Sequence, residues 1–164
     1  MTNDRSDLDQ DWGKDVGTTS AILERAAARA KQKAISYAGL VTPDEAHALM
    51  QAGLATIVDV RTRFEAEYVG RIPGTPLIEW KALGAAEPDP AFIEQLEALP
   101  DKRENLLFLC RSGVRSHAAA AAATAAGHRH AYNILEGFEG DLDEDRHRGE
   151  KGGWRKAGLP WIQS

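Results

Sequence analysis

The segment Leu106-Leu-Phe-Leu-Cys110-Arg-Ser-Gly-Val-Arg-Ser116, which runs into an alanine-rich stretch ending at Gly127, decides the fold of this chain. The apolar run at 106–109 predicts a strand buried on both faces, because such a strand need not alternate apolar and polar residues. The alanines at 118–126 predict a helix. The only cysteine of the chain therefore lies where a buried strand ends and a tight loop, eased by Gly113, leads to a helix N-terminus.

This position of Cys110 favours an anion. A loop that feeds a helix N-terminus directs backbone N–H groups inward, and the helix adds partial positive charge. The nearest candidate anion is the thiolate of Cys110, with Arg111 and Arg115 as neighbouring positive charges. The general alternative is an inert core thiol, which is the commoner role of a cysteine that ends an apolar strand.

Two motifs of the chain resemble those of the rhodaneses, sulfurtransferases that carry sulfane sulfur as a cysteine persulfide. Cys110-Arg-Ser-Gly-Val-Arg115 resembles their active-site loop. Val58-Asp-Val-Arg61, followed by Glu65 and by Gly70-Arg-Ile-Pro-Gly-Thr75, resembles their upstream motifs, although Arg71 replaces the usual histidine. The resemblance spans residues 40–161 and implies a three-layer α/β domain, with a mainly parallel sheet of about five strands covered by helices on both faces.

The resemblance also implies a chemistry for the loop. Cys110 would attack thiosulfate or a similar small sulfur-donor anion and hold the sulfur as a persulfide, without a metal or cofactor. The expected substrate-binding residues are the rest of the loop: Arg111, Ser112, Gly113, Val114, Arg115 and Ser116. A ring of loop N–H groups would stabilise the anionic sulfur. The chain has no second cysteine, so the acceptor would be cyanide or an external thiol, which includes the thiol of a partner protein.

Three further residues, Asp59, Arg61 and Glu65, are expected to support the site. Asp59 and Arg61 match the supporting pair of the family and would lie at the carboxyl end of a parallel strand, where ligands bind in open α/β sheets. The alternative for Arg61 is a structural ion pair with Glu65. His117 follows the loop, and its default interpretation is a histidine on the helix surface.

Two other classes of function compete with sulfur transfer. The first is phosphate or arsenate chemistry on a related loop. Tyrosine-phosphatase-type loops place an arginine six positions after the cysteine, whereas this chain has Ser116 there and Arg115 one position earlier. The shorter ring favours a sulfur atom over a tetrahedral oxyanion. The second class is a non-catalytic rhodanese-like interaction module. The complete loop with its cysteine argues against such a module but leaves open a persulfide carrier that serves one partner.

The composition is that of an ordinary globular protein. The chain has 164 residues with 43% hydrophobic and 27% charged residues. A net charge of −5 disfavours nucleic acid as the partner. No apolar run is long enough for a membrane span, and the N-terminus lacks the pattern of a signal peptide, so we expect a cytoplasmic protein with no membrane partner.

The order of patterns along the chain predicts its organisation. Residues 1–18 are expected to form a flexible acidic tail, and 19–38 an extra helix that packs on the domain. The alternative is a helix that binds a partner or a membrane surface, because the segment carries net positive charge. The rhodanese-like domain would occupy 39–164, with a charged insertion at 141–153. Thr42 and Glu45 form a capping-box pattern at the start of its first helix. Short strands are expected at 40–41, 55–60, 77–78, 106–109 and 131–135.

Overall fold

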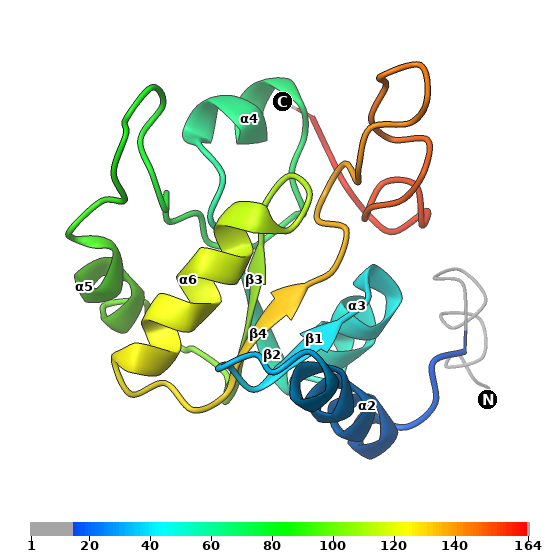
Figure 1. The fold of residues 1–164 in the computed structure, drawn as a ribbon, viewed down its shortest axis with the longest axis vertical. Coiled ribbons are helices and arrows are strands. Elements are labelled where there is room, and N and C mark those ends of the chain that lie inside the picture. The colour runs from blue at the N-terminus through cyan, green and yellow to red at the C-terminus, as the bar shows by residue number, and fades with distance from the viewer. Residues whose placement is uncertain (1–14, 164) are drawn as a thin grey trace, which may run out of the picture.

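A computed structural model describes residues 15–163, which form a parallel sheet with helices on both of its faces (Figure 1). The four strands lie in the order β1-β4-β3-β2. In chain order the elements are α2 (Thr19–Gln32), β1 (Gly39–Val41), α3 (Pro43–Gln51), β2 (Ala55–Asp59), α4 (Arg63–Tyr68), α5 (Phe92–Glu97), β3 (Asn105–Leu109), α6 (Val114–Ala125) and β4 (Ala131–Ile134).

The alternation of side chains along β3 creates two hydrophobic layers. Leu107 and Leu109 point to the face covered by α2 and α3. Leu106, Phe108 and the following Cys110 point to the opposite face, which is covered by α5 and α6. Burial on both faces explains why the strand is apolar throughout. It also places the thiol on the side of the sheet against which α6 packs.

The sequence predicts about five strands, whereas the described residues form a sheet of four. Residues 77–78 do lie beside β2, where Ile78 N–H donates to Asp59 O at 2.9 Å and Leu77 forms a single isolated bridge with Asp59. The preceding residue is Pro76, which has no N–H and cannot extend a ladder of hydrogen bonds. The segment therefore touches the edge of the sheet without becoming a strand.

Helix α2 packs on the domain through three buried residues, Ile22, Ala26 and Ala30. It ends at Gln32, earlier than its expected end near residue 38, and Ala34 then adopts a φ of 55°, which is incompatible with a continuing helix. Arg29 reaches across to the buried Glu45 at the start of α3, with an N–O distance of 2.7 Å. The predicted capping box of Thr42 and Glu45 is confirmed. Residues 1–14 of the expected tail lie outside the described residues.

The carboxyl ends of the strands converge on one edge of the sheet, and α4 lies across this edge (Figure 1). Helix α6 begins at Val114, four residues before the expected start at 118, because Gly113 turns the chain directly into the helix with a φ of 113°. Arg115 and Ser116 consequently belong to the first turn of α6. Their positions are thus fixed by helix geometry and not by a free loop.

The charged segment 141–153 contains neither helix nor strand. It is held to the domain by hydrogen bonds, of which Gly149 N–H to Glu139 O is 2.7 Å and Arg148 Nη1 to Gly140 O is 2.8 Å. None of the helices between residues 15 and 163 is long and apolar enough to cross a membrane.

Candidate active site

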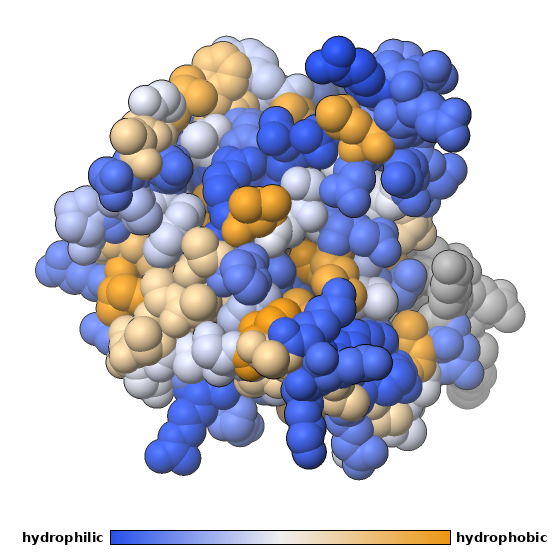
Figure 2. All heavy atoms as spheres, viewed as in Figure 1, coloured by the Kyte–Doolittle hydropathy of each residue, from blue (hydrophilic) through white to orange (hydrophobic). Residues whose placement is uncertain are grey.

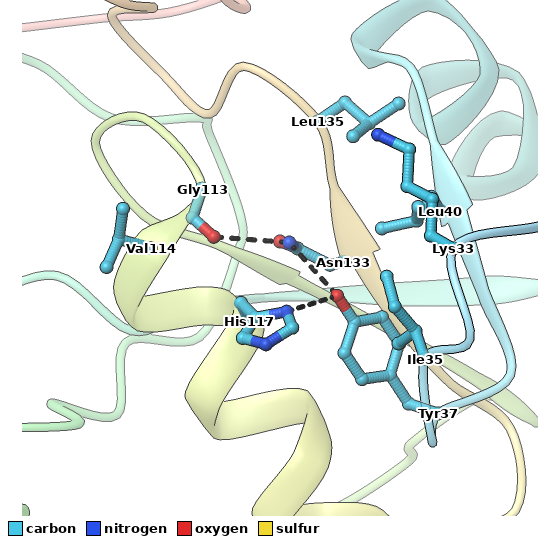
Figure 3. Close-up of a pocket in the computed structure, with 9 residues that line it drawn as sticks. All are labelled: Lys33, Ile35, Tyr37, Leu40, Gly113, Val114, His117, Asn133 and Leu135. Atoms are coloured by element: carbon cyan, nitrogen blue, oxygen red, sulfur yellow. Dashed lines mark hydrogen bonds between the residues drawn. The ribbon is translucent and has the colours of Figure 1, made fainter. Parts of the chain in front are cut away.

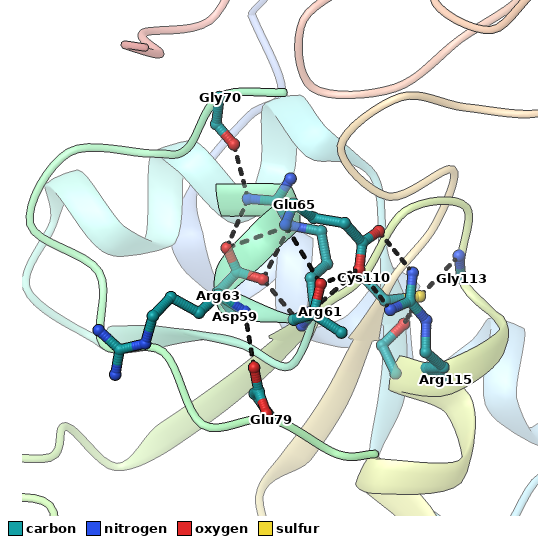
Figure 4. Close-up of polar contacts among 11 residues, drawn as sticks. Asp59, Arg61, Arg63, Glu65, Gly70, Glu79, Cys110, Gly113 and Arg115 are labelled. Carbon is teal, nitrogen blue, oxygen red and sulfur yellow. Dashed lines mark hydrogen bonds and ion pairs between the residues drawn. The ribbon is translucent and has the colours of Figure 1, made fainter. Parts of the chain in front are cut away.

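The Sγ atom of Cys110 lies in a small polar cradle at the N-terminus of α6 (Figure 4). It accepts a hydrogen bond from Gly113 N–H at 3.1 Å and lies 3.2 Å from the hydroxyl oxygen of Ser116. Only 1% of the residue is exposed. Within residues 15–163, the loop N–H that binds the thiol sulfur is that of Gly113. The ring of N–H donors expected around a persulfide sulfur stays a prediction.

The loop is fastened to the segment that follows β4. The carbonyl of Cys110 accepts from Phe138 N–H at 2.8 Å, and that of Arg111 accepts from Glu139 N–H at 2.9 Å. Gly137 permits this close approach, because a Cβ atom there would lie 2.6 Å from the carbonyl oxygens of Cys110 and Arg111. The backbone of the loop is thus positioned by a turn more than 25 residues away in the sequence.

Arg115 is held by Glu65 of α4 through a bidentate ion pair, with N–O distances of 2.7 and 2.9 Å (Figure 4). Glu65 also accepts from the N–H of Thr62, which makes the same carboxylate the capping residue of α4. Burial favours the neutral acid, yet the hydrogen bonds from Arg115 and Thr62 outweigh it and lower the pKa of Glu65 from 4.5 to about 2. The positive charge of Arg115 is therefore partly neutralised beside the loop.

Arg61 pairs with Asp59 and not with Glu65, so the alternative of an Arg61–Glu65 ion pair is wrong. Arg61 Nη2 lies 2.7 Å from the Asp59 carboxylate and 2.8 Å from Gly70 O, and neither side chain of the pair is exposed by more than 2%. Asp59 and Arg61 are two positions apart at the carboxyl end of β2, so their side chains lie on the same side of the chain. The Arg61 guanidinium carbon also lies 4.4 Å from the centroid of the Phe138 ring. Because Phe138 N–H binds the Cys110 carbonyl, Phe138 connects the Asp59–Arg61 pair to the loop.

A second polar network extends from Ser116, and the sequence patterns did not reveal it. The Ser116 hydroxyl donates to Asn133 Oδ1 at 2.6 Å, while Asn133 Nδ2 donates to Gly113 O at 3.2 Å and to the Tyr37 hydroxyl at 3.4 Å. Tyr37 in turn lies 2.7 Å from His117 Nδ1 (Figure 3). An asparagine in the apolar strand 131–135 was the available signal, because a buried polar side chain requires a partner.

The remaining loop residues lie on the rim. Arg111 and Val114 are exposed, and Ser112 is half-buried. His117 is exposed as expected for the helix surface, although its ring is bound to Tyr37. Within residues 15–163, no group of three or more His, Cys, Asp or Glu side chains could hold a metal ion.

The profile of the rhodanese-like domain family matches residues 42–144, well over half of the chain. This chain belongs to the rhodanese-like domain family. An uncharacterized relative in Rickettsia rickettsii, the RP600 homolog, is 38% identical over 109 residues, which cover 65% of this chain and 82% of the relative. The described edge of the sheet, with Asp59, Arg61 and Cys110, lies inside the matched region.

Two solved structures are similar to this rhodanese-like chain along most of its length. Rv0390 from M. tuberculosis has a TM-score of 0.69 and 40% sequence identity, with 78% of this chain and 99% of the other covered. RPA3614 from Rhodopseudomonas palustris, described as a protein of unknown function and possible tyrosine phosphatase, has a TM-score of 0.51 and 26% identity, with 92% and 98% covered.

Proposed function

We propose that this rhodanese-like protein is a sulfurtransferase that carries sulfane sulfur as a persulfide of Cys110. The observation that carries the proposal is the placement of Sγ at the N-terminus of α6, where Gly113 N–H already donates to it at 3.1 Å. A thiolate and a terminal persulfide sulfur are both anionic, so both are stabilised by the same donor and by the helix dipole. Arg115, in the first turn of α6, adds positive charge next to the sulfur.

The first half-reaction forms the persulfide. The Cys110 thiolate attacks the outer sulfur of thiosulfate, the S–S bond of the donor breaks, and sulfite leaves with the bonding electron pair. Attack needs access to Sγ, which is buried, so the rim formed by Ser112 and Val114 must move. The ion pair of Arg115 with Glu65 limits this movement from the side of α4.

The second half-reaction empties the site. An external thiolate attacks the outer sulfur, the bond from Cys110 Sγ to that sulfur breaks, and Cys110 leaves as a thiolate. Both steps conserve charge and need no oxidant or reductant. Because Cys110 is the only cysteine of the chain, no internal thiol can intercept the persulfide. This favours transfer to a separate small molecule or to a protein thiol.

The deciding experiment is the intact mass of the reduced protein after incubation with thiosulfate. We expect the gain of one sulfur atom, its loss on addition of cyanide with formation of thiocyanate, and neither change in Cys110→Ser. Serine preserves the size of the side chain but is not a nucleophile at neutral pH, so a folded variant is a suitable control. A wild-type protein that gains no sulfur from thiosulfate or from an organic persulfide would overturn the proposal.

Phosphate-ester hydrolysis is the competing function, because the similar protein RPA3614 is described as a possible tyrosine phosphatase. The sixth position after the cysteine is Ser116, whose hydroxyl faces Asn133, while Arg115 is engaged by Glu65. Neither group is free to bind the three equatorial oxygens of a phosphoryl group. We therefore expect no turnover of p-nitrophenyl phosphate, and turnover that depends on Cys110 in the absence of sulfur transfer would favour the phosphatase.

A further inference from the structure

A pocket of about 300 Å³ lies beside the loop of Cys110 (Figure 3). One wall comes from the stretch from the end of α2 to β1, through Lys33, Ile35 and Leu40, and the opposite wall comes from Gly113 and Val114 at the rim of the loop. The first wall precedes residue 42, where the match to the family profile begins. The pocket is thus formed by joining an N-terminal segment of this chain to the common domain.

The pocket shares a wall with the site of the nucleophile. The N–H of Gly113 donates to Cys110 Sγ at 3.1 Å. The same residue lines the pocket, and its carbonyl accepts from Asn133 Nδ2 at 3.2 Å. Val114, the next residue, is 76% exposed at the rim. The Gly113–Val114 rim therefore lies between a ligand seated in the pocket and the sulfur.

The lining of the pocket is mainly aliphatic. Ile35, Leu40, Val114 and Leu135 contribute apolar side chains. The polar atoms at its base are already partnered, since the Tyr37 hydroxyl is bonded to His117 Nδ1 at 2.7 Å and also accepts from Asn133. The base therefore demands no polar ligand group, and the walls suit a short carbon chain.

The charge at the mouth of the pocket selects one end of such a ligand. Lys33 is exposed and, among residues 15–163, forms no ion pair. The Tyr37 hydroxyl accepts from Asn133 Nδ2 and lies 2.7 Å from His117 Nδ1, so neither Asn133 nor Tyr37 competes with Lys33 for an anion. An ammonium at the mouth of an apolar pocket matches a carboxylate attached to a carbon chain.

We propose that this pocket binds the sulfur acceptor, and that the acceptor is a small organic thiol bearing a carboxylate. Its carbon chain would lie against Ile35 and Leu135, its carboxylate near Lys33, and its thiolate would cross the rim at Gly113 to attack the outer sulfur on Cys110. The bond between that sulfur and Cys110 breaks, Cys110 leaves as a thiolate, and the acceptor leaves as a persulfide. The inference rests on the proposed sulfur transfer and specifies its acceptor.

The test starts from protein whose Cys110 has been loaded with sulfur, so that only the acceptor step is measured. The acceptors are 3-mercaptopropionate, the neutral 2-mercaptoethanol, and cyanide, which is too small to use the pocket. We expect Lys33→Glu to lower the second-order rate constant for 3-mercaptopropionate by about fivefold, as expected for the loss of one exposed ion pair, and to change the rate constants of the other two acceptors, which carry no carboxylate, much less.

A matched control separates the pocket from the overall charge. Lys31→Glu makes the same change of charge at the C-terminal end of α2, but Lys31 does not line the pocket. An equal effect of Lys31→Glu and Lys33→Glu would overturn the proposal. A second variant, Leu135→Trp, fills the pocket and, once shown to be folded by circular dichroism, should slow both organic thiols but not cyanide. Unchanged rates for both thiols would also overturn the proposal.

Binding without reaction distinguishes failure of the pocket from failure of the sulfur transfer. The thioether 3-(methylthio)propionate carries the same carboxylate but cannot accept sulfur. We expect it to shift the NMR signals of Ile35 and His117 in the wild-type protein and much less in Lys33→Glu. If it binds while no sulfur is ever transferred, the proposed function is wrong and the pocket stands. If sulfur is transferred to cyanide while the thioether does not bind, the pocket assignment is wrong.

Discussion

The hydroxyl of Ser116 points its only proton at Asn133 Oδ1, 2.6 Å away, and not at the sulfur of Cys110. The orientation of the Asn133 amide fixes this direction, because its Nδ2 donates to Gly113 O and its Oδ1 must therefore accept. Ser116 thus offers a lone pair to Sγ, 3.2 Å away, to which a protonated thiol can donate. In this arrangement the Ser116 hydroxyl does not donate to the sulfur, and a thiolate gains the Ser116 donor only if the bond to Asn133 breaks.

Removal of the Asn133 side chain should therefore make Cys110 more reactive. In Asn133→Ala the Ser116 hydroxyl is free to donate to the thiolate, and a hydrogen bond to a charged group contributes about 1.5–3 kcal/mol. We expect the midpoint of the pH profile for alkylation by iodoacetamide to move to lower pH by about one unit or more. A midpoint that stays in place or moves to higher pH would contradict the direction that we assign to the Ser116 proton.

Two controls accompany this prediction. Asn105 is also buried and lies at the opposite end of β3, where its Nδ2 donates to Leu54 O at 2.8 Å. Asn105→Ala should cost similar stability and leave the alkylation profile unchanged. The double variant Asn133→Ala with Ser116→Ala should match Ser116→Ala alone, because the effect of Asn133 acts through the hydroxyl.

The sequence predicts the layers of this fold better than its polar networks. The apolar run at 106–109, the alanine-rich helix and the Thr42–Glu45 capping box depend on local periodicity and propensity, so they can be identified from short windows. The partner of a charged residue is set by tertiary packing. Spacing along one segment suggested Arg61 with Glu65, whereas the fold brings Arg115 to Glu65 from 50 residues away.

The same limit explains what was missed at the candidate site. Asn133 is one polar residue in a buried strand, and its partners Ser116 and Tyr37 are 17 and 96 residues away. The start of α6 at Val114 depends on the conformation of Gly113, which a propensity scale treats as a helix breaker. The roles expected for Cys110 and its loop remain predictions that require the experiments described here.

Glu65 should make the stability of the protein depend on pH in acid. Its folded pKa of about 2 lies below its ordinary value of 4.5, so the ionised form is stabilised by folding. This stabilisation is complete above pH 4.5 and is lost as the pH falls towards 2. We expect Glu65→Gln to lower the free energy of unfolding by about 2 kcal/mol at pH 7, and the difference from wild type to shrink steadily below pH 4.5. Urea unfolding of both proteins at pH 7, 4 and 3 measures this difference in the free energy of unfolding. A difference that does not depend on pH would contradict the ion-pair explanation.

Arg115 and Glu65 should act as a unit in the reaction with anionic donors. Arg115→Ala leaves the carboxylate of Glu65 without its cation close to Cys110, which disfavours both the thiolate and an approaching anion. We expect the rate constant for thiosulfate to fall about tenfold or more, and the double variant with Glu65→Gln to recover part of the loss.

Arg111→Ala serves as the control, because Arg111 is exposed and its side chain lies on the rim. Equal losses in the two arginine variants would show that only the local charge matters, not the pairing with Glu65.

Gly137 should be the position where a single methyl group most damages the loop without touching its side chains. Its φ is 65°, and an added Cβ would lie 2.6 Å from the carbonyl oxygens of both Cys110 and Arg111, which are backbone atoms that cannot rotate away. Gly127 has a φ of 107° with nothing within 4 Å of its Cβ position, so Gly127→Ala measures the backbone strain alone, about 1–2 kcal/mol. We expect Gly137→Ala to lower the free energy of unfolding clearly more, by about 3 kcal/mol or above, and to speed alkylation of Cys110 because the loop is displaced from its cradle.

Thermal unfolding and iodoacetamide kinetics on the two variants provide the comparison. If both glycine variants lose the same stability and Cys110 stays equally protected, the contact of Gly137 with the loop does not hold the nucleophile in place.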